Sequence, residues 1–228
     1  ILVDQLPFPQ NEILAFGIWT LGASMVLVGD QNIADATKNS APSLIINSDV
    51  NYFEKIKTFS KNFNPTYKPL LADEAMVFWN DGKGIKLSHY NLLVNTNGIQ
   101  HAIDLYENQT FHVSLEPKSM AWVILQAILP LYSGAPLTAK DTDICLGENE
   151  GNFLIKFQWE QLEETNPPTL FMLNENTAFI SMNKTPIHLS GMNNTNKPTE
   201  ITGHSVMMGY LDDELNKKVF KNDSLNII

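Results

Sequence analysis

Residues 75–97 read AMVFWNDGKGIKLSHYNLLVNTN, and their pattern decides the predicted fold. An apolar strand comes first, a turn with glycine and lysine follows, and Ser88 and His89 then lead into an amphipathic helix. The N–H groups of a glycine-rich turn, a lysine and the positive end of a helix all favour a bound anion. The stretch therefore predicts a phosphate-binding loop. The residues expected to contact the phosphate are Asn80, Gly82, Lys83, Gly84, Ser88 and His89.

Two of these residues also have a simpler interpretation. Lys83 could be a solvated loop lysine, and a single histidine after a helix cap, as at His89, is often a structural hydrogen-bonding residue. His101 and His112 have no partner at metal-ligand spacing and are expected on the surface or in the core.

The same stretch resembles the phosphate loop of the adenylate-forming superfamily, which includes acyl- and aryl-CoA synthetases, peptide-synthetase adenylation domains and luciferases. In that family a strand, a turn rich in Ser, Thr and Gly, Pro-Lys-Gly and Ser-His-x-Asn-Leu follow in this order. The matching residues here are Lys83, Gly84, Ser88, His89, Asn91 and Leu92. Residues 79–82, Trp-Asn-Asp-Gly, replace the longer turn, so the loop is shortened and carries the acidic Asp81.

Further segments resemble the same family in the expected order: residues 12–28, 129–137 and 201–213. Residues 171–181 can be laid on the family's Tyr-Gly-x-Thr-Glu motif, which would make Glu175 the magnesium-binding carboxylate and Asn174 the counterpart of the threonine. A competing alignment places residues 157–171 in the helix and strand that precede this motif, and the motif is then absent.

The resemblance implies an AMP-forming acid–thiol ligase of the acyl-CoA synthetase type, with ATP and Mg²⁺ as cofactors. Its partners would be an acyl or aryl carboxylate and either CoA or a carrier protein. Only about 120 residues separate the loop from Met207, fewer than the family uses, and the family's C-terminal lid domain and its catalytic lysine are expected to be absent.

The shortened loop is expected to lower activity, because it removes hydrogen bonds to the phosphates of the nucleotide. Each hydrogen bond to a charged phosphate contributes roughly 1.5–3 kcal/mol, so the loss of two or three would weaken nucleotide binding by about a thousandfold or more. Three hypotheses follow. The first is a reduced adenylate-forming enzyme with weak or no activity, and the second is a non-catalytic pseudoenzyme that binds an acyl group or a carrier protein as a scaffold. The third is an unrelated doubly wound protein.

Composition excludes several other classes of function. The net charge of −10 argues against a nucleic acid or an anionic membrane as partner, because both bind basic surfaces. Fifteen lysines and no arginine leave the chain without the planar guanidinium that proteins favour for phosphate recognition. One cysteine cannot form an internal disulfide, and no apolar run reaches the length of a membrane span, so the cytoplasm is the expected location.

The expected fold is α/β: a mainly parallel sheet flanked by helices, with a smaller antiparallel, β-rich C-terminal part. Residues 1–140 would form the first part and residues 141–228 the second. One sheet should contain the strands near 24–28, 43–47, 75–79 and 111–115, covered by helices at 9–21, 89–106 and 119–132. Residues 200–211 should form a strand and turn in the antiparallel part. Helix 119–132 is apolar on every side and should be central, and its Trp122 is expected to contact a bound acyl group.

Overall fold

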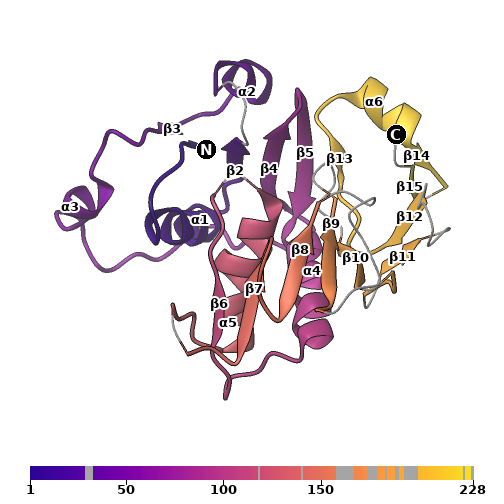
Figure 1. Cartoon of the computed structure of the whole chain (residues 1–228). Coiled ribbons are helices and arrows are strands. Elements are labelled where there is room, and N and C mark those ends of the chain that lie inside the picture. Colours follow the sequence, from indigo (N-terminus) through magenta and orange to yellow (C-terminus); the bar gives the residue numbers. More distant parts are fainter. Residues whose placement is uncertain are drawn as a thin grey trace.

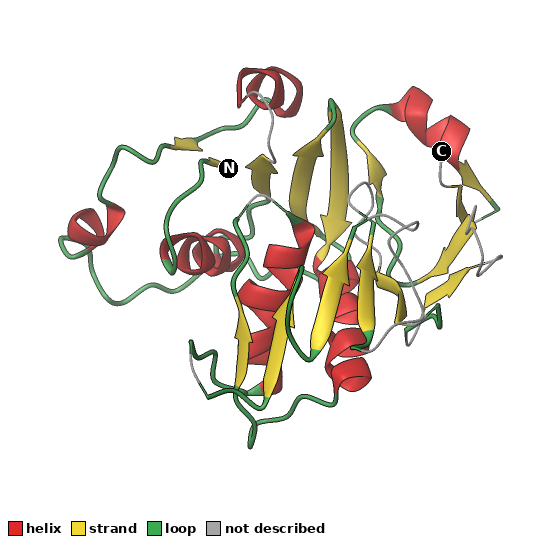
Figure 2. Ribbon diagram, in the orientation of Figure 1, coloured by secondary structure: helices red, strands yellow, loops and turns green. Residues whose placement is uncertain are grey.

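The computed structural model describes residues 1–28, 33–117, 119–139, 141–157, 167–173, 179–182, 184–187, 190–192, 200–222 and 224–226. Helices and strands alternate through the first half of the chain, and strands predominate in the second half (Figure 1, Figure 2). Within the described residues the strands form three sheets, here named A, B and C. The predicted α/β class, with a mainly parallel part and a smaller antiparallel part, is confirmed.

Sheet A contains the strand on which the phosphate-loop prediction rests. Its order is β13-β5-β4-β2-β1-β3, with parallel pairing from β3 to β4 and antiparallel pairing from β4 to β13. The strands are β1 (Leu2–Val3), β2 (Met25–Val28), β3 (Ile45–Ile46), β4 (Glu74–Asn80), β5 (Lys83–Ser88) and β13 (Gly209–Tyr210). The predicted placement of the strands near 24–28, 43–47 and 75–79 in one sheet is therefore confirmed.

The helices pack mostly on one face of sheet A. They are α1 (Gln10–Thr20), α4 (His89–Ile103), the π-helix η1 (Trp122–Ile128) and α5 (Leu129–Ser133). One hydrophobic core joins this face, these helices and one face of sheet B. The opposite face of sheet A packs against α2 (Ile33–Ser40), whose Ala36 is fully buried. A short helix, α3 (Tyr52–Ile56), begins after Asn51, which caps it.

The predicted central helix over 119–132 is confirmed in position but not in form. Every residue of η1 is buried, as expected for a segment that is apolar on every side. The chain winds as a π-helix up to Ile128 and as an α-helix after it. Pro130 gives a physical reason, since proline has no N–H to donate to the carbonyl of Gln126 and its ring would collide with that carbonyl in an ordinary α-helix.

Sheet B corrects one predicted strand. Its order is β10-β9-β8-β7-β6, and only β10 is antiparallel. The strands are β6 (Phe111–Val113), β7 (Ile144–Gly147), β8 (Phe153–Lys156), β9 (Thr169–Met172) and β10 (Phe179–Met182). The strand predicted at 111–115 was assigned to the same sheet as β4, and this was wrong, because β6 pairs with β7. That pairing crosses residue 140, and the division at this residue remains a prediction.

The link between β7 and β8 is unusually short for parallel strands. Parallel neighbours need a crossover of roughly a dozen residues or more, yet residues 148–152 alone join these two. The chain reverses so tightly that a Cβ on Gly151, whose φ is +139°, would lie 2.6 Å from the carbonyl oxygen of Cys145. Glycine is therefore required at this position.

Sheet C is small and antiparallel. It contains β11 (Ser190–Met192), β12 (Glu200–Gly203), β14 (Phe220–Lys221) and β15 (Ser224–Asn226), in the order β11-β12-β15-β14, and α6 (Asp213–Val219) precedes β14. The predicted strand near residue 200 is confirmed as β12. The rest of the 200–211 prediction is corrected, because Gly209 and Tyr210 leave sheet C and pair with β5 at the edge of sheet A.

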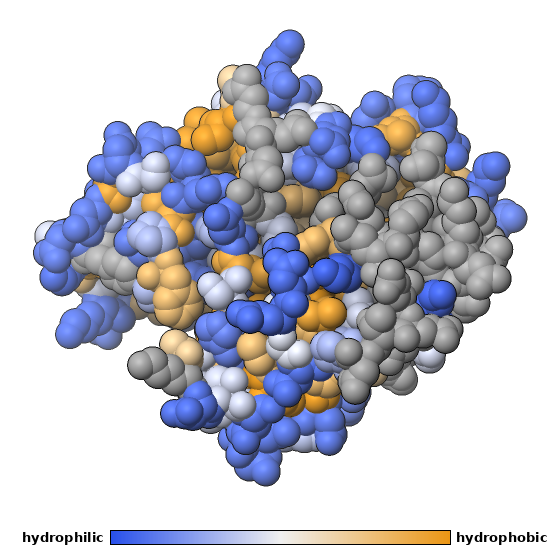
Figure 3. Space-filling model, viewed as in Figure 1, coloured by the Kyte–Doolittle hydropathy of each residue, from blue (hydrophilic) through white to orange (hydrophobic). Residues whose placement is uncertain are grey.

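Hydrophilic side chains cover much of the described surface on the face shown in Figure 3, with apolar side chains between them. Among the described residues, no helix combines the length and the apolar character that crossing a membrane requires.

Candidate functional site

The predicted phosphate loop is a tight turn between two strands. Asn80 pairs with Lys83, and Asp81 and Gly82 alone connect them, with φ angles of +49° and +72°. Two residues in this left-handed conformation, with the sequence Asp-Gly, are typical of a type I′ hairpin. The expectation that the glycine–lysine segment forms a loop leading directly into a helix is therefore wrong, since Lys83 and Gly84 begin a strand.

Gly84 is explained by packing in sheet A. A Cβ on this residue would lie 2.4 Å from Leu211 Cδ1 and 3.1 Å from Trp79 Cε3. The same residue accepts a hydrogen bond of 2.7 Å from the N–H of Leu211. Glycine at this position thus lets the segment after β13 cross closely over β5.

The predicted phosphate contacts do not come together. Asn80, Gly82 and Lys83 lie at one end of the β4–β5 hairpin, and Ser88 and His89 lie at the other end, where α4 begins (Figure 1). Five strand residues at about 3.3 Å each separate Lys83 from Ser88 by about 17 Å. A single phosphate group cannot contact both ends. The structure thus divides the predicted site into two groups.

Ser88 and Asn91 form a capping box at the start of α4. Ser88 Oγ accepts a hydrogen bond from the N–H of Asn91 at 3.1 Å, and Asn91 Oδ1 accepts one from the N–H of Ser88 at 3.0 Å. Asn91 Nδ2 also donates to the carbonyl oxygens of His204 (3.0 Å) and Val206 (2.8 Å). This pair therefore starts the helix and holds the turn that leads to β13.

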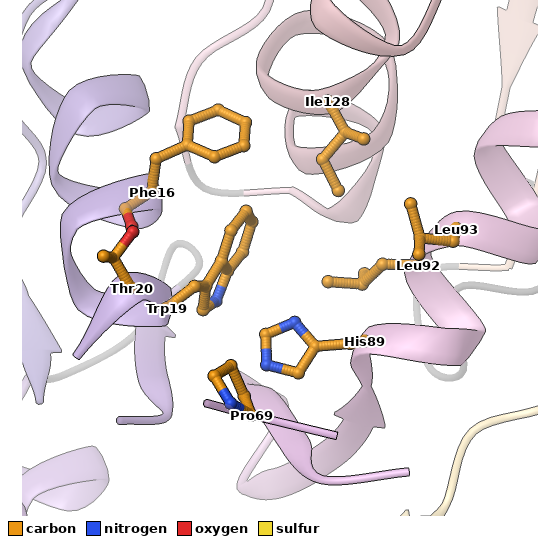
Figure 4. A pocket seen from close by; sticks show the side chains of 8 residues that line it. All are labelled: Phe16, Trp19, Thr20, Pro69, His89, Leu92, Leu93 and Ile128. Carbon is orange, nitrogen blue, oxygen red and sulfur yellow. The ribbon is translucent and has the colours of Figure 1, made fainter. Parts of the chain in front are cut away.

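His89 lines a pocket on the far side of α4 from Asn91. The pocket has a volume of about 320 Å³, and its walls are mostly apolar (Figure 4). Its lining residues are Phe16, Trp19, Thr20, Pro69, His89, Leu92, Leu93 and Ile128. Burial lowers the pKa of His89 below its ordinary value, and the carboxylate of Asp73 opposes this shift in part.

The proposed magnesium ligand Glu175 and its neighbour Asn174 lie outside the described residues. Among the residues that are described, no group of three or more His, Cys, Asp or Glu side chains is arranged to hold a metal ion. The magnesium prediction therefore remains a prediction.

A second pocket, with a volume of about 390 Å³, lies where β6 ends. Ligands commonly bind at the carboxyl ends of parallel strands. The residues that line it are Phe8, His112, Val113, Ser114, Leu115, Gln126, Leu137, Thr138 and Ala139. We call it the His112 pocket. Phe8 comes from the segment after β1, which lies at the same edge of sheet A as the Asp81–Gly82 turn, because β1 and β4 run in the same direction.

His112 is oriented by one hydrogen bond. Its Nδ1 lies 2.8 Å from the carbonyl oxygen of Thr138. A carbonyl oxygen can only accept, so Nδ1 carries the proton and the neutral ring keeps its lone pair on Nε2.

A buried polar network supports the pocket wall. Gln126 Oε1 accepts from the N–H of Leu115 at 2.8 Å, and Gln126 Nε2 donates to Glu12 Oε1 at 2.8 Å. Trp122 Nε1 donates to the same Glu12 oxygen at 2.8 Å. Trp122 is fully buried and is not among the residues that line the pocket, so the expected direct contact between this side chain and an acyl group has no counterpart in the pocket geometry.

Comparison with known proteins shows the fold. No protein-family model and no curated protein sequence matches the chain. Its structure is similar to o-succinylbenzoate CoA synthetase (MenE) of Bacillus subtilis, solved with its acyl-adenylate intermediate, at a TM-score of 0.78 and 11% identity. The match covers 99% of this chain and 81% of that chain.

Other solved structures agree. MatB of Rhodopseudomonas palustris matches with a TM-score of 0.80 and 10% identity, over 99% of this chain and 64% of that one. McyG A-PCP, complexed with phenylalanyl-adenylate, matches with a TM-score of 0.76 and 15% identity, over 99% of this chain and 54% of that one. The fold is therefore that of adenylate-forming enzymes, and the chain spans about half to four fifths of the length of these neighbours.

Proposed function

We propose that this chain is a reduced acyl-adenylate-forming protein that binds an acyl or aryl carboxylate in the His112 pocket and has weak or no adenylation activity. The observation that carries the proposal is the two-residue Asp81–Gly82 turn, which stands where the family resemblance places a long phosphate loop. If the adenylation activity is lost completely, the chain is a non-catalytic module that still binds the acyl group.

The turn offers little to a triphosphate. β5 is paired with β4 on one side and with β13 on the other, so the backbone groups that follow Lys83 belong to sheet A. This leaves the two exposed turn residues to contact a phosphate group. One of them, Asp81, places a carboxylate at the position where phosphate charge would have to be stabilised. Losing two or three phosphate hydrogen bonds would lower nucleotide affinity by about a thousandfold or more.

The His112 pocket has the character of a site for a carboxylic acid. Its walls include apolar side chains from Phe8, Val113 and Leu137, and polar groups from His112 and Thr138 lie among them. His112 is held by the Thr138 carbonyl through Nδ1, so its Nε2 can accept a hydrogen bond from the O–H of a carboxylic acid. A pocket of this size suits a small ligand with an apolar body.

The acyl group could also arrive as a thioester. Solved neighbours include a ligase complexed with methylmalonyl-CoA and AMP, and one A-PCP protein. CoA carries several phosphate charges, whereas this chain has a net charge of −10 and no arginine. These properties favour a free carboxylate or a carrier-bound acyl group over CoA itself.

Calorimetric titration with octanoate, benzoate and phenylalanine in the absence of ATP tests this proposal. We expect one of these classes to bind with a Kd of about a micromolar, which corresponds to about 8 kcal/mol. His112→Leu should weaken binding at least about tenfold, because the acid loses its hydrogen-bonding partner.

The matched control is His101→Leu, the same change at an exposed position of α4, which should leave the affinity unaltered. Absence of binding by all three acids, or equal affinity in the wild type and in His112→Leu, would contradict the proposal.

A further inference from the structure

The pocket around His89, which we call the Trp19 pocket, is separate from the His112 pocket. The two share no lining residue. On α4, His89, Leu92 and Leu93 recur at the spacing of one helix face, whereas Asn91 and Asn95 bind the 204–206 turn from another face. The Trp19 pocket also lies at the opposite end of β5 from the Asp81–Gly82 turn.

Hydrogen bonds and close packing hold the walls of the Trp19 pocket in place. Trp19 Nε1 donates to the carbonyl oxygen of Ala75 at 2.8 Å, which fixes the indole. Pro69 lies between two residues that are hydrogen-bonded to Asp73. The carboxylate of Asp73 accepts one hydrogen bond from the hydroxyl of Tyr67 (2.5 Å) and one from the N–H of Leu70 (2.8 Å). The ring of Tyr67 in turn packs on Gly22, where a Cβ would lie 2.1 Å from Tyr67 Cδ1. The pocket is thus formed before any ligand arrives.

Aromatic rings give the pocket its chemical preference. The rings of Phe16 and Trp19 lie edge to face with centroids 5.3 Å apart and an interplanar angle of 86°. Trp19 and His89 do the same at 6.1 Å and 79° (Figure 4). Aromatic pairs favour such edge-to-face contacts, so a further flat ring would find both faces and edges to pack against.

His89 supplies a polar group that is available to a ligand. Within the part of the chain that the structure describes, its ring nitrogens make no hydrogen bond. Burial lowers its pKa, so the ring is neutral near pH 7 and offers one N–H donor and one acceptor nitrogen. None of the lining residues is a lysine, and the charged group that acts on the pKa of His89 is the anionic Asp73. A neutral ligand is therefore favoured over a carboxylate.

We propose that the Trp19 pocket is a second binding site, for a neutral aromatic alcohol whose hydroxyl hydrogen-bonds to His89. An engineered cavity of about 150 Å³ holds benzene, so the present volume of about 320 Å³ accommodates two fused rings. This inference does not rest on the proposed carboxylate site.

Calorimetric titration of the whole chain with 2-naphthol, naphthalene and 2-naphthoate tests the inference. We expect 2-naphthol to bind about tenfold more tightly than naphthalene, because only 2-naphthol can form a hydrogen bond to the partly buried His89. In His112→Leu, in which the proposed carboxylate site is impaired, the anionic 2-naphthoate should bind more weakly than 2-naphthol. His89→Leu should reduce the affinity for 2-naphthol to that for naphthalene and should leave naphthalene binding in place.

Two further variants make the test specific. His112→Leu, the same change in the other pocket, should leave 2-naphthol binding unaltered. Leu93→Trp places a larger side chain in the Trp19 pocket and so fills part of it, without altering His89. The binding of both 2-naphthol and naphthalene should become at least about tenfold weaker. Equal affinities for naphthol and naphthalene, absence of binding by either, or a loss caused by His112→Leu and not by His89→Leu would overturn the inference.

Discussion

Replacing Trp122 with alanine is expected to lower the free energy of unfolding by about 3–5 kcal/mol, the range for removal of a large buried aromatic side chain. Trp122 is fully buried in η1, at the centre of the core that joins sheets A and B. The substitution also removes the indole N–H that donates to Glu12 Oε1. Urea denaturation measured by circular dichroism gives the difference directly.

Trp122→Phe separates packing from hydrogen bonding. Phenylalanine keeps a ring in the core and removes the donor to the Glu12 carboxylate, so the expected loss is about 1–3 kcal/mol. A loss below about 1 kcal/mol for Trp122→Ala would show that this side chain is not at a rigid, filled centre of the core. Any reduction of ligand binding in Trp122→Ala must be interpreted against this loss of stability.

Asn91→Ala is the second change with a large expected effect, about 2–4 kcal/mol of unfolding free energy. The side chain caps the N–H of Ser88 and donates to the carbonyl oxygens of His204 and Val206. Removing it leaves several buried polar groups without partners at once, and it disconnects α4 from the turn before β13. Thermal and urea denaturation would both register the change.

Asn97→Ala is the matched control on the same helix. Asn97 is half-buried and donates to the hydroxyl of the exposed Tyr132 at 3.0 Å. Its removal should lower stability by less than about 1 kcal/mol. Equal effects of the two substitutions would contradict the structural role assigned to Asn91, and with it the interpretation of its partner Ser88 as a helix cap instead of a phosphate ligand.

Local patterns predicted most helices and strands but not all of their partners. The apolar runs at 24–28 and 75–79 and the periodicity of 89–106 have local causes, and the structure confirms them. The strand at 111–115 was placed in the wrong sheet, since the sequence of a strand does not specify which distant strand it pairs with. The hairpin itself had a local signal, because Asp-Gly between alternating residues favours a type I′ turn. Lys83 and Gly84, which follow the turn, also fit a phosphate-binding loop, and this second pattern led to the incorrect prediction of a loop.

The His112 pocket could not be assembled from the sequence. Its supporting network joins Glu12 to Trp122 and Gln126 across more than a hundred positions. The available signal was the presence of Glu12 and Gln126 in segments that are otherwise apolar, because a buried polar side chain needs a partner. That signal indicates a network but does not identify its members, and the proximity of His112 to Thr138 depends on the pairing of β6 with Leu137.

Exchange of pyrophosphate into ATP in the presence of Mg²⁺ and the octanoate, benzoate and phenylalanine panel tests the central claim most directly. Because the Asp81–Gly82 turn replaces the longer phosphate loop, we expect little or no exchange with any of the acids, while one of them still binds without ATP. Robust exchange that Lys83→Ala abolishes would contradict the account and would identify the chain as an active adenylate-forming enzyme.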